Sequence, residues 1–194
     1  MTSTLSDTKR IFEDARSHVA WQARAVPDEL LRQIYAVAKM GPTSANCCPM
    51  RIVFVTSAAA KARLKPCLFE GNVEKTMSAP TTAIIAHDTR FFDLLPQLYP
   101  ARDMRTGFAN NAELAATTAF RNSSLQGGYL MLAARALGLD CGPMSGFDNA
   151  KVDAEFFPDG RWKSNFLCNL GYGDSSKLHP RNPRLSFEEA CRVL

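Results

Sequence analysis

The amino-acid sequence predicts one domain of the α/β or α+β class, in which a β-sheet is layered with helices. Three short apolar runs, at residues 52–55, 82–86 and 166–170, are typical of buried strands. They alternate with helix patterns, of which the clearest cover residues 27–40 and 114–137. Because internal repeats and linker-like tracts are lacking, we expect all 194 residues to form a single layered domain.

The composition is that of an ordinary globular protein, with 46% hydrophobic and 22% charged residues. The net charge of +4 is mild, and no run of Lys and Arg marks a surface for nucleic acid. The polar N-terminus lacks the apolar core of a secretory signal, and no apolar run is long enough to span a bilayer. We therefore expect a cytoplasmic protein that binds neither nucleic acid nor membranes.

The six cysteines form no C-x-x-C pair, and the three histidines are far apart in the sequence. This pattern predicts free thiols and no metal site. Cys47 and Cys48 are neighbours and raise the possibility of a nucleophile. Since no His or acidic residue lies nearby in the sequence to activate either thiol, we favour the interpretation that both are small loop residues.

The first strong helix pattern has Pro27 in its first turn and ends at Gly41 and Pro42. Residues 43–49 then form a polar loop of small residues. Such a loop is suited to hydrogen-bonding the edge of a ligand, although a turn before the next strand has the same composition. Strand 52–55 is apolar without interruption, which indicates a central place in the sheet with both faces covered.

Ser57 is expected to cap a helix over residues 58–64, and strand 82–86 follows. Residues 88–111 lose all periodicity and mix aromatic residues with prolines and arginines. A segment of this kind suits a lid or a pocket wall, and it is equally compatible with a surface excursion.

The long helix pattern of residues 114–137 is apolar over much of its circumference, which places it inside the domain or at a subunit interface. Gly138 is expected to end it in a left-handed conformation. The small residues of the loop at 141–147 would let its backbone approach a flat ligand. After strand 166–170 comes a basic arm, and a capping box at residues 186–189 opens the last helix.

Common catalytic and nucleotide-binding motifs are absent from the sequence: there is no G-x-G-x-x-G after a strand, no P-loop and no G-x-S-x-G. A cofactor is therefore expected to carry any reaction. Four separated groups offer cations and polar side chains, and this set suits FMN. They are residues 16–18, residues 43–46, Asn72 with Lys75, and Arg181 with Arg184.

Several stretches resemble the FMN-dependent nitroreductase superfamily in the right order: GPTSANC at 41–47, TAFRNSS at 118–124, GPMSGFD at 142–148, GYGDSSKL at 171–178 and PRLSFEEA at 183–190. The chain is most similar to the branch that contains the malonic semialdehyde reductase, or 3-hydroxypropionate dehydrogenase, of the Rut pathway of pyrimidine degradation. The resemblance implies an α+β nitroreductase-like fold, with a mixed sheet packed by helices. It also implies an intertwined homodimer with two FMN sites at the interface.

The same resemblance implies which residues hold the FMN phosphate. Arg16, Ser17 and His18 match the N-terminal segment at the phosphate and ribityl chain, and Arg181 and Arg184 match the rest of a phosphate clamp, with the choice between these two left open. Many members of the family have a further basic residue shortly after the N-terminal Arg-Ser. This chain has apolar residues there, so we expect its phosphate to depend more on the C-terminal arginines.

Other matches concern the flavin ring. Asn72 is expected at the ribityl chain or pyrimidine edge, and Lys75 near flavin N1 and the C2 carbonyl. The loop that reaches the flavin from the partner subunit matches Thr43, Ser44, Asn46 and Cys48. The residues expected along the flavin near N5 are Pro143, Met144, Ser145 and Gly146. Cys48-Pro49-Met50 replaces the usual Gln-Pro-Trp of the family, which removes one amide partner of the flavin.

The function that the resemblance implies is an FMN-dependent oxidoreductase with NADH or NADPH as co-substrate. We hypothesise ping-pong hydride transfer through flavin N5, with malonic semialdehyde reduced to 3-hydroxypropionate. Its carboxylate could pair with Arg102 or Arg105. Two alternatives stay open: a broad NAD(P)H nitro or quinone reductase, and a flavin-binding module without turnover.

Overall fold

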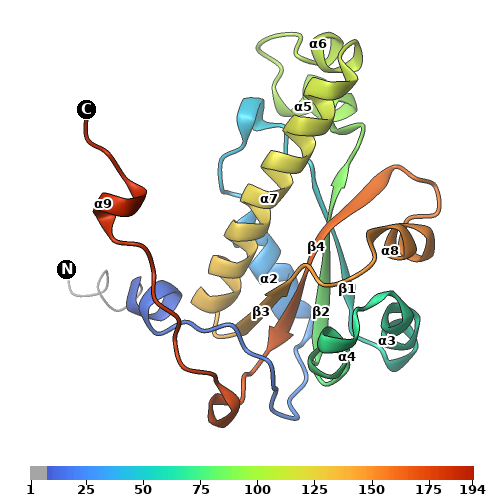
Figure 1. Ribbon diagram of the computed structural model, residues 1–194. Coiled ribbons are helices and arrows are strands. Elements are labelled where there is room, and N and C mark those ends of the chain that lie inside the picture. Colours follow the sequence, from blue (N-terminus) through green and yellow to red (C-terminus); the bar gives the residue numbers. More distant parts are fainter. Residues whose placement is uncertain (1–7) are drawn as a thin grey trace.

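The computed structural model describes residues 8–194, so residues 1–7 of the expected domain lie outside the described residues. It has an α+β architecture built on a four-stranded sheet in the order β1-β2-β4-β3 (Figure 1). The strands are β1 (Met50–Val55), β2 (Thr81–Asp88), β3 (Asp140–Met144) and β4 (Trp162–Gly171). All three ladders are antiparallel. The parallel part of the expected mixed sheet is limited, among the described residues, to one bridge between Ser17 and Cys141.

Helices cover both faces of this sheet (Figure 1). On one face lie α2 (Asp28–Ala38) and the long α7 (Ala112–Ala136), whose Leu130 and Ala134 share a buried cluster with Ile34 of α2 and Ile85 of β2. On the other face lie α3 (Ala58–Leu64), α4 (Glu70–Met77) and α8 (Asn149–Phe156). Their apolar side chains bury Ile84 and Leu167 from the second side. The sheet is therefore the middle layer of three.

Residues 88–111 are ordered rather than irregular. They form η4 (Phe91–Leu94), α5 (Leu95–Leu98) and α6 (Arg105–Ala109). Phe91, Leu95 and Phe108 pack with Ala115 and Ala119 of α7 in a third apolar cluster. The segment is thus a helical cap on the first half of α7. The aromatic residues that interrupt any helical period in this part of the sequence are among those that pack the segment against α7.

The remaining elements are short. They are η1 (Lys9–Glu13), η2 (Ser44–Asn46), η3 (Lys65–Cys67), η5 (Ser175–Lys177) and α9 (Phe187–Ala190). Within residues 8–194, none of the helices combines the length and the apolarity that crossing a membrane requires.

Three local predictions are confirmed. The Ser57 hydroxyl accepts a hydrogen bond from the Ala60 amide and begins α3. Gly138 follows α7 with φ +92°, a left-handed conformation that glycine adopts without strain. Ser186 and Glu189 form the predicted capping box of α9.

Two strand predictions are wrong. β1 lies at the edge of the four-stranded sheet, not in its centre. Its faces are only partly covered, since Ile52, Val53 and Phe54 are half-buried, and an apolar run carries no information about neighbours within the sheet. The stretch expected as a loop contains β3, in which Pro143 pairs with Cys168. Proline is compatible with a strand at a sheet edge, where its missing N–H costs no ladder bond.

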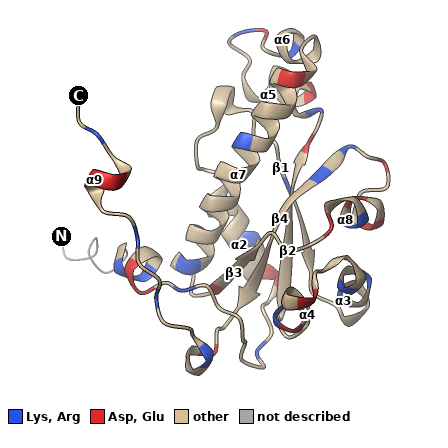
Figure 2. Cartoon of the chain, viewed as in Figure 1, with Lys and Arg blue, Asp and Glu red and all other residues tan. Residues whose placement is uncertain are grey.

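The surface of α7 also differs from the expectation of a helix that is apolar on most sides. Its sheet-facing side buries polar residues: Gln126 accepts a hydrogen bond from the Met50 amide at 2.9 Å, and Ser123 accepts one from Asn165 at 2.8 Å. Leu114, Phe120 and Leu125 are instead exposed on the outer side. Figure 2 shows few charges along α7 compared with α3, α4 and α8. The outer side of α7 is therefore apolar and uncovered within one chain.

A cation is buried between α3, α4 and β2. The side chain of Lys61 is 4% exposed, and its Nζ donates to the Thr76 carbonyl at 2.7 Å and to Thr82 Oγ1 at 2.6 Å. None of the ion pairs among residues 8–194 includes it. Burial lowers the pKa of Lys61 from 10.5 to about 8.

This buried cation predicts a pH dependence of stability. Between pH 8 and pH 10.5 the unfolded chain keeps the Lys61 proton that the folded chain has lost, so the free energy of unfolding is expected to rise with pH, by up to about 3 kcal/mol. Urea denaturation at pH 7, 8, 9 and 10 measures it. Lys61→Met is expected to lack this rise, and exposed Lys65→Met to retain it. Equal slopes in both variants would contradict the prediction.

Candidate functional site

Most of the predicted site residues lie along the edge strand β3 and the segments beside it, and we call them the main cluster. Its members are Arg16, Ser17, His18, Asn72, Lys75, Pro143, Met144, Ser145, Gly146 and Arg181. The N-terminal segment lies beside β3, since the His18 amide donates to the Cys141 carbonyl at 3.0 Å. The two segments run very close there: a Cβ on Gly142 would lie 2.5 Å from the His18 carbonyl oxygen.

Helix α4 brings the next part of the main cluster to the end of β3. Asn72 Nδ2 donates to the Gly146 carbonyl at 2.7 Å, and the Phe69 amide donates to the same oxygen at 3.1 Å. A Cβ at position 146 would lie 2.1 Å from Asn72 Nδ2, so this contact requires glycine. Lys75 lies in the last turn of α4 and is half-buried. Its carbonyl accepts a hydrogen bond from the Trp21 indole at 3.0 Å.

The residues predicted along the flavin lie in the end of β3 and just after it, and they differ in which side chains they expose. Pro143 and Ser145 are exposed, whereas the Met144 side chain is buried in the cluster under α3, α4 and α8. Thr76 Oγ1 also donates to Met144 Sδ at 3.4 Å. Only the backbone of Met144 is therefore available to a ligand lying along this segment.

Arg16 and Arg181 link the N-terminal segment to the C-terminal arm at the main cluster. Arg16 donates to the His179 carbonyl, and Arg181 Nη2 donates to the Ala15 carbonyl at 2.9 Å and to the Glu13 carbonyl. A guanidinium has five N–H groups, so each arginine keeps donors for an anion. Arg184 instead bonds to the carbonyls of Asn182 and Pro183 within the C-terminal arm. One chain thus places Arg181, and not Arg184, beside Arg16.

His18 has an unmet hydrogen-bonding group inside the main cluster. Its side chain is buried, its Nε2 lies 3.4 Å from Asp140 Oδ1, and its Nδ1 has no partner among the described residues. A Cβ on Gly173 would lie 1.9 Å from this Nδ1, so the atom faces the backbone of Gly173 and not an open site. The main cluster as a whole combines the cations of Arg16, Arg181 and Lys75 with the amide of Asn72. This set fits a phosphorylated heteroaromatic cofactor such as FMN.

The loop of Thr43, Ser44, Asn46 and Cys48, which we call the distal loop, lies elsewhere. The Ser44 amide donates to Asn122 Oδ1 at 2.9 Å, and Asn46 Nδ2 donates to the Leu98 carbonyl at 2.8 Å. Arg135, which bonds to the Ile11 carbonyl near the main cluster, is 13 residues further along α7 than Asn122 (135 − 122). Thirteen helical residues span about 20 Å. One chain therefore does not bring the distal loop to the main cluster.

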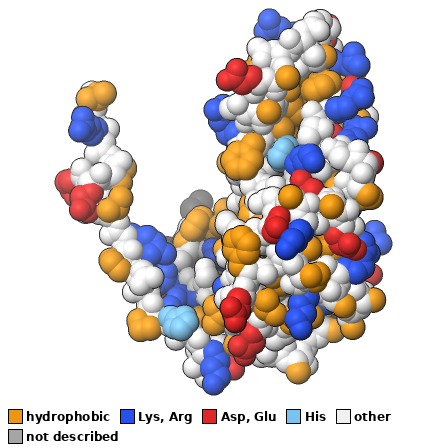
Figure 3. All heavy atoms as spheres, turned by 45° about the vertical axis from the view of Figure 1, so that its right-hand side comes forward, with side chains coloured by type: hydrophobic (Ala, Val, Ile, Leu, Met, Phe, Trp, Pro, Cys, Tyr) orange, Lys and Arg blue, Asp and Glu red, His pale blue; other side chains and the backbone are white. Residues whose placement is uncertain are grey.

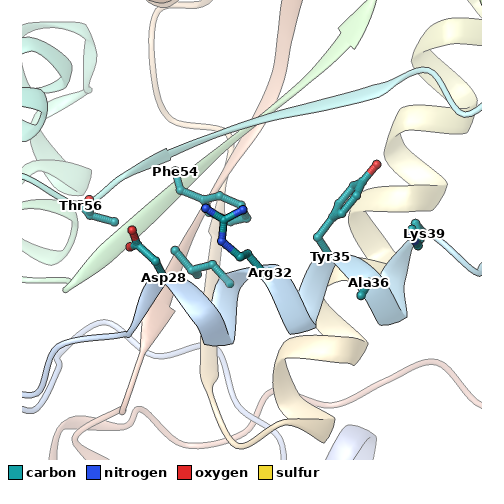
Figure 4. Close-up of a pocket in the computed structure, with 8 residues that line it drawn as sticks. Asp28, Arg32, Tyr35, Ala36, Lys39, Phe54 and Thr56 are labelled. Atoms are coloured by element: carbon teal, nitrogen blue, oxygen red, sulfur yellow. The ribbon is translucent and has the colours of Figure 1, made fainter.

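The two arginines proposed for substrate also lie outside the main cluster. Arg102 and Arg105 are exposed and line a cavity of about 300 Å³ with Tyr99. Arg105 pairs with Asp93 at 3.3 Å. A cavity of about 590 Å³ lies between α2 and β1, where Arg32, Tyr35 and Phe54 face it (Figure 4). None of the predicted site residues lines this second cavity.

Cysteine chemistry is not indicated at the site. All six cysteines are free, and Cys47 is fully buried. Burial raises the pKa of Cys47 to about 11, so its thiol is protonated at neutral pH and is a poor nucleophile. Within the described part of the chain, no group of three or more His, Cys, Asp and Glu side chains is placed to hold a metal ion.

Three residues that support the site were not singled out from the sequence. Trp21 and Asn169 both donate to the Lys75 carbonyl, Asn169 at 3.1 Å. Asn122 anchors the distal loop through Ser44. Only Asn122 had a signal, because it lies within one of the stretches that carry the resemblance. The other two act through one backbone oxygen, which leaves no mark in the sequence.

Known proteins are similar to this chain over most of its length. Residues 13–172 match the model of the nitroreductase family. A protein of Rhodopseudomonas palustris (strain TIE-1), named "Putative NADH dehydrogenase/NAD(P)H nitroreductase", is 61% identical over 196 residues and is matched over 100% of both chains. A protein of Ralstonia nicotianae with the same description is 60% identical over 95% of both chains.

A solved structure shares the fold. It is described as a "putative nitroreductase in complex with FMN" from Exiguobacterium sibiricum 255-15, with a TM-score of 0.85 and 22% identity, and it covers 95% of this chain and 96% of its own. The α+β nitroreductase-like fold expected from the sequence is thereby confirmed. The family match covers most of the residues that build the main cluster, and the two relatives match nearly the whole chain. The chain belongs to the nitroreductase family.

Proposed function

We propose that this protein is an FMN-dependent oxidoreductase that uses NADH or NADPH as co-substrate. The placing of Arg16, His18, Asn72 and Lys75 along edge strand β3 carries the proposal, because two segments distant in sequence bring cations and polar groups to one strand. The names of the close relatives support the NAD(P)H part, and the FMN in the similar solved structure supports the cofactor.

Each part of the main cluster has a proposed role. Arg16 and Arg181 would hold the phosphate by charge-assisted hydrogen bonds. The segment of Ser17 and His18 and the amide of Asn72 would bind the ribityl chain or the ring edge. The Lys75 cation would stabilise negative charge at N1 and the C2 carbonyl. When bound, FMN would supply the redox chemistry, hydride transfer through N5 in ping-pong order.

We propose further that two chains form an intertwined homodimer with an FMN site at each interface. The outer side of α7 is apolar and uncovered, and the distal loop lies about 20 Å along α7 from its own chain's main cluster. A second copy would supply that loop. The C-terminal arm also stands clear of the body, with Leu185 and Phe187 exposed (Figure 3). Arg184 on this arm would then reach a partner's site rather than its own.

For the physiological substrate we propose malonic semialdehyde, reduced to 3-hydroxypropionate in pyrimidine degradation. Support comes from the resemblance to that branch and from Arg102, which is exposed beside a cavity in the helical cap on α7. A short carboxylate would pair with Arg102 or Arg105.

Anaerobic mixing with NADPH and then with NADH tests the function. Rapid loss of the flavin absorbance is expected, and reoxidation should be fastest with malonic semialdehyde. Faster reoxidation by nitrofurazone or menadione would replace the aldehyde with a broad nitro or quinone reductase activity. A bound flavin that neither nucleotide bleaches would identify a binding module, and a purified protein without FMN would refute the proposal.

A further inference from the structure

A buried chain of hydrogen bonds ends on the helix that carries Asn72 and Lys75. It starts at Lys61 Nζ, which donates to Thr82 Oγ1 at 2.6 Å. The Thr82 hydroxyl then donates to Asn169 Oδ1 at 2.7 Å, and Asn169 Nδ2 donates to the Lys75 carbonyl at 3.1 Å. Thr82 and Asn169 are fully buried on adjacent strands β2 and β4. These hydrogen bonds thus connect α3, by way of side chains on β2 and β4, to the last turn of α4.

The last turn of α4 depends on these donors because a helix leaves its final carbonyls without internal partners. In a helix that continued, the Thr76 carbonyl would bond to the amide of residue 80, but α4 ends at Met77 and residue 80 is proline, which has no N–H. Lys61 Nζ supplies this missing donor at 2.7 Å. Asn169 and Trp21 supply donors to the Lys75 carbonyl. A cation at this end is also favoured by the helix dipole.

Alternative explanations for a buried lysine do not fit this site. Within residues 8–194 no carboxylate pairs with Lys61, so the lysine does not complete an ion pair. Burying such a cation costs free energy, and an apolar side chain would fill the space between α3 and β2 more cheaply. Lys61 donates two hydrogen bonds, one to the end of α4 and one to β2, and an apolar residue can donate neither.

We propose that Lys61 is a positioning residue, which acts through Thr82 and Asn169 to hold Lys75 in place for the cofactor. The role of Lys75 in this inference rests on the proposed function. The fixing of α4 rests on the hydrogen bonds alone. The hydrogen bond from Asn72 to Gly146 fixes the start of α4, and the hydrogen bonds that begin at Lys61 fix its end. Lys75 lies in this last turn of α4.

Amide hydrogen exchange tests the fixing of α4 without any cofactor. Lys61→Met and Thr82→Val are each expected to speed exchange of the amides at residues 75–78 by at least roughly tenfold, since each removes two buried hydrogen bonds. Thr82→Ser keeps the hydroxyl and should restore slow exchange. Lys65→Met removes the same charge from an exposed position nearby and should change nothing. Unchanged exchange in both Lys61→Met and Thr82→Val would overturn the proposal.

A double-mutant cycle tests whether Lys61 acts through Lys75. Lys61→Met should weaken FMN binding by roughly tenfold and lower the midpoint potential of bound FMN in the unmodified background. In the Lys75→Met background it should change neither quantity. Equal effects in both backgrounds would show that Lys61 acts independently of Lys75 and would overturn the proposal. If the unmodified protein binds no FMN, the proposed function fails, and hydrogen exchange alone decides whether Lys61 fixes α4.

Discussion

Replacing Lys75 with methionine is expected to lower the rate at which NADPH reduces bound FMN by about 100-fold, because a fixed cation in a site of this kind contributes on the order of 3 kcal/mol. Lys75 is half-buried in the last turn of α4, and none of the ion pairs among residues 8–194 includes it. Its charge is therefore available to a ligand. Anaerobic stopped-flow absorbance with saturating NADPH measures the rate.

Two controls separate this effect from loss of structure. The Lys65→Met variant carries the same change on an exposed side chain and should reduce FMN at the unmodified rate. The urea midpoint of Lys75→Met should stay near that of the unmodified protein. Full FMN occupancy together with an unchanged reduction rate in Lys75→Met would remove Lys75 from the proposed mechanism.

The second large effect is expected from Asp88→Asn, which should lower the free energy of unfolding by about 3–5 kcal/mol. Asp88 is 1% exposed and accepts hydrogen bonds from Arg51 at 2.8 Å and from Arg161 at 3.0 and 3.1 Å. Removing its charge leaves two guanidinium groups without their counter-charge. Arg51 also donates to the Cys48 carbonyl at 3.1 Å, so the distal loop should loosen in the same variant. Urea denaturation at pH 7 measures the loss.

The matched control is Glu155→Gln, which removes a carboxylate that pairs with Arg63 at an exposed position. Its expected cost is less than about 1 kcal/mol. A cost for Asp88→Asn no greater than that of Glu155→Gln would contradict the prediction.

Asp88 also predicts sensitivity to acid. Burial raises the pKa of Asp88, but hydrogen bonds from Arg161 and the Arg90 amide and the charge of Arg51 together hold it below its ordinary value. The folded state thus binds this proton less readily than the unfolded state. The resulting stabilisation is present above the ordinary pKa and is lost as the pH falls through the folded value. Asp88→Asn should show a weaker loss of stability in acid than the unmodified protein.

The sequence predicted the elements whose signal is local. Ser57, Gly138 and Ser186 were placed correctly because a cap or a left-handed residue depends on neighbours within a few positions. The place of β1 in the sheet was not predicted, since its apolar run carries no information about lateral partners. β3 was missed because Cys141, Gly142 and Pro143 have the composition of a turn and form a strand only through pairing with β4.

The candidate site was predictable only in part. Composition and motifs indicated a cofactor and its chemistry, and the resemblance supplied the residues. The structure brings ten of those residues into the main cluster, while the distal loop and Arg184 stay apart from it within one chain. Asn169 and Lys61 could not be predicted, because their contribution depends on which strand and helix their side chains reach. The absence of an N–H at residue 80 was visible in the sequence, but the carbonyl that needed a donor was not.

The interruption in the pairing of β2 with β4 has a consequence for changes in chain length. Ile85 faces Phe166 and Ala86 faces Ser164, so Asn165 is an extra residue in β4, and it bonds to Ser123 and Ser124 of α7. Deleting residue 165 would close the ladder with every other side chain on its original face, at the loss of those two bonds. A deletion in mid-strand away from this point would turn buried side chains outward. We therefore expect the fold to tolerate the loss of one residue at the bulge but not the loss of one residue elsewhere in β4.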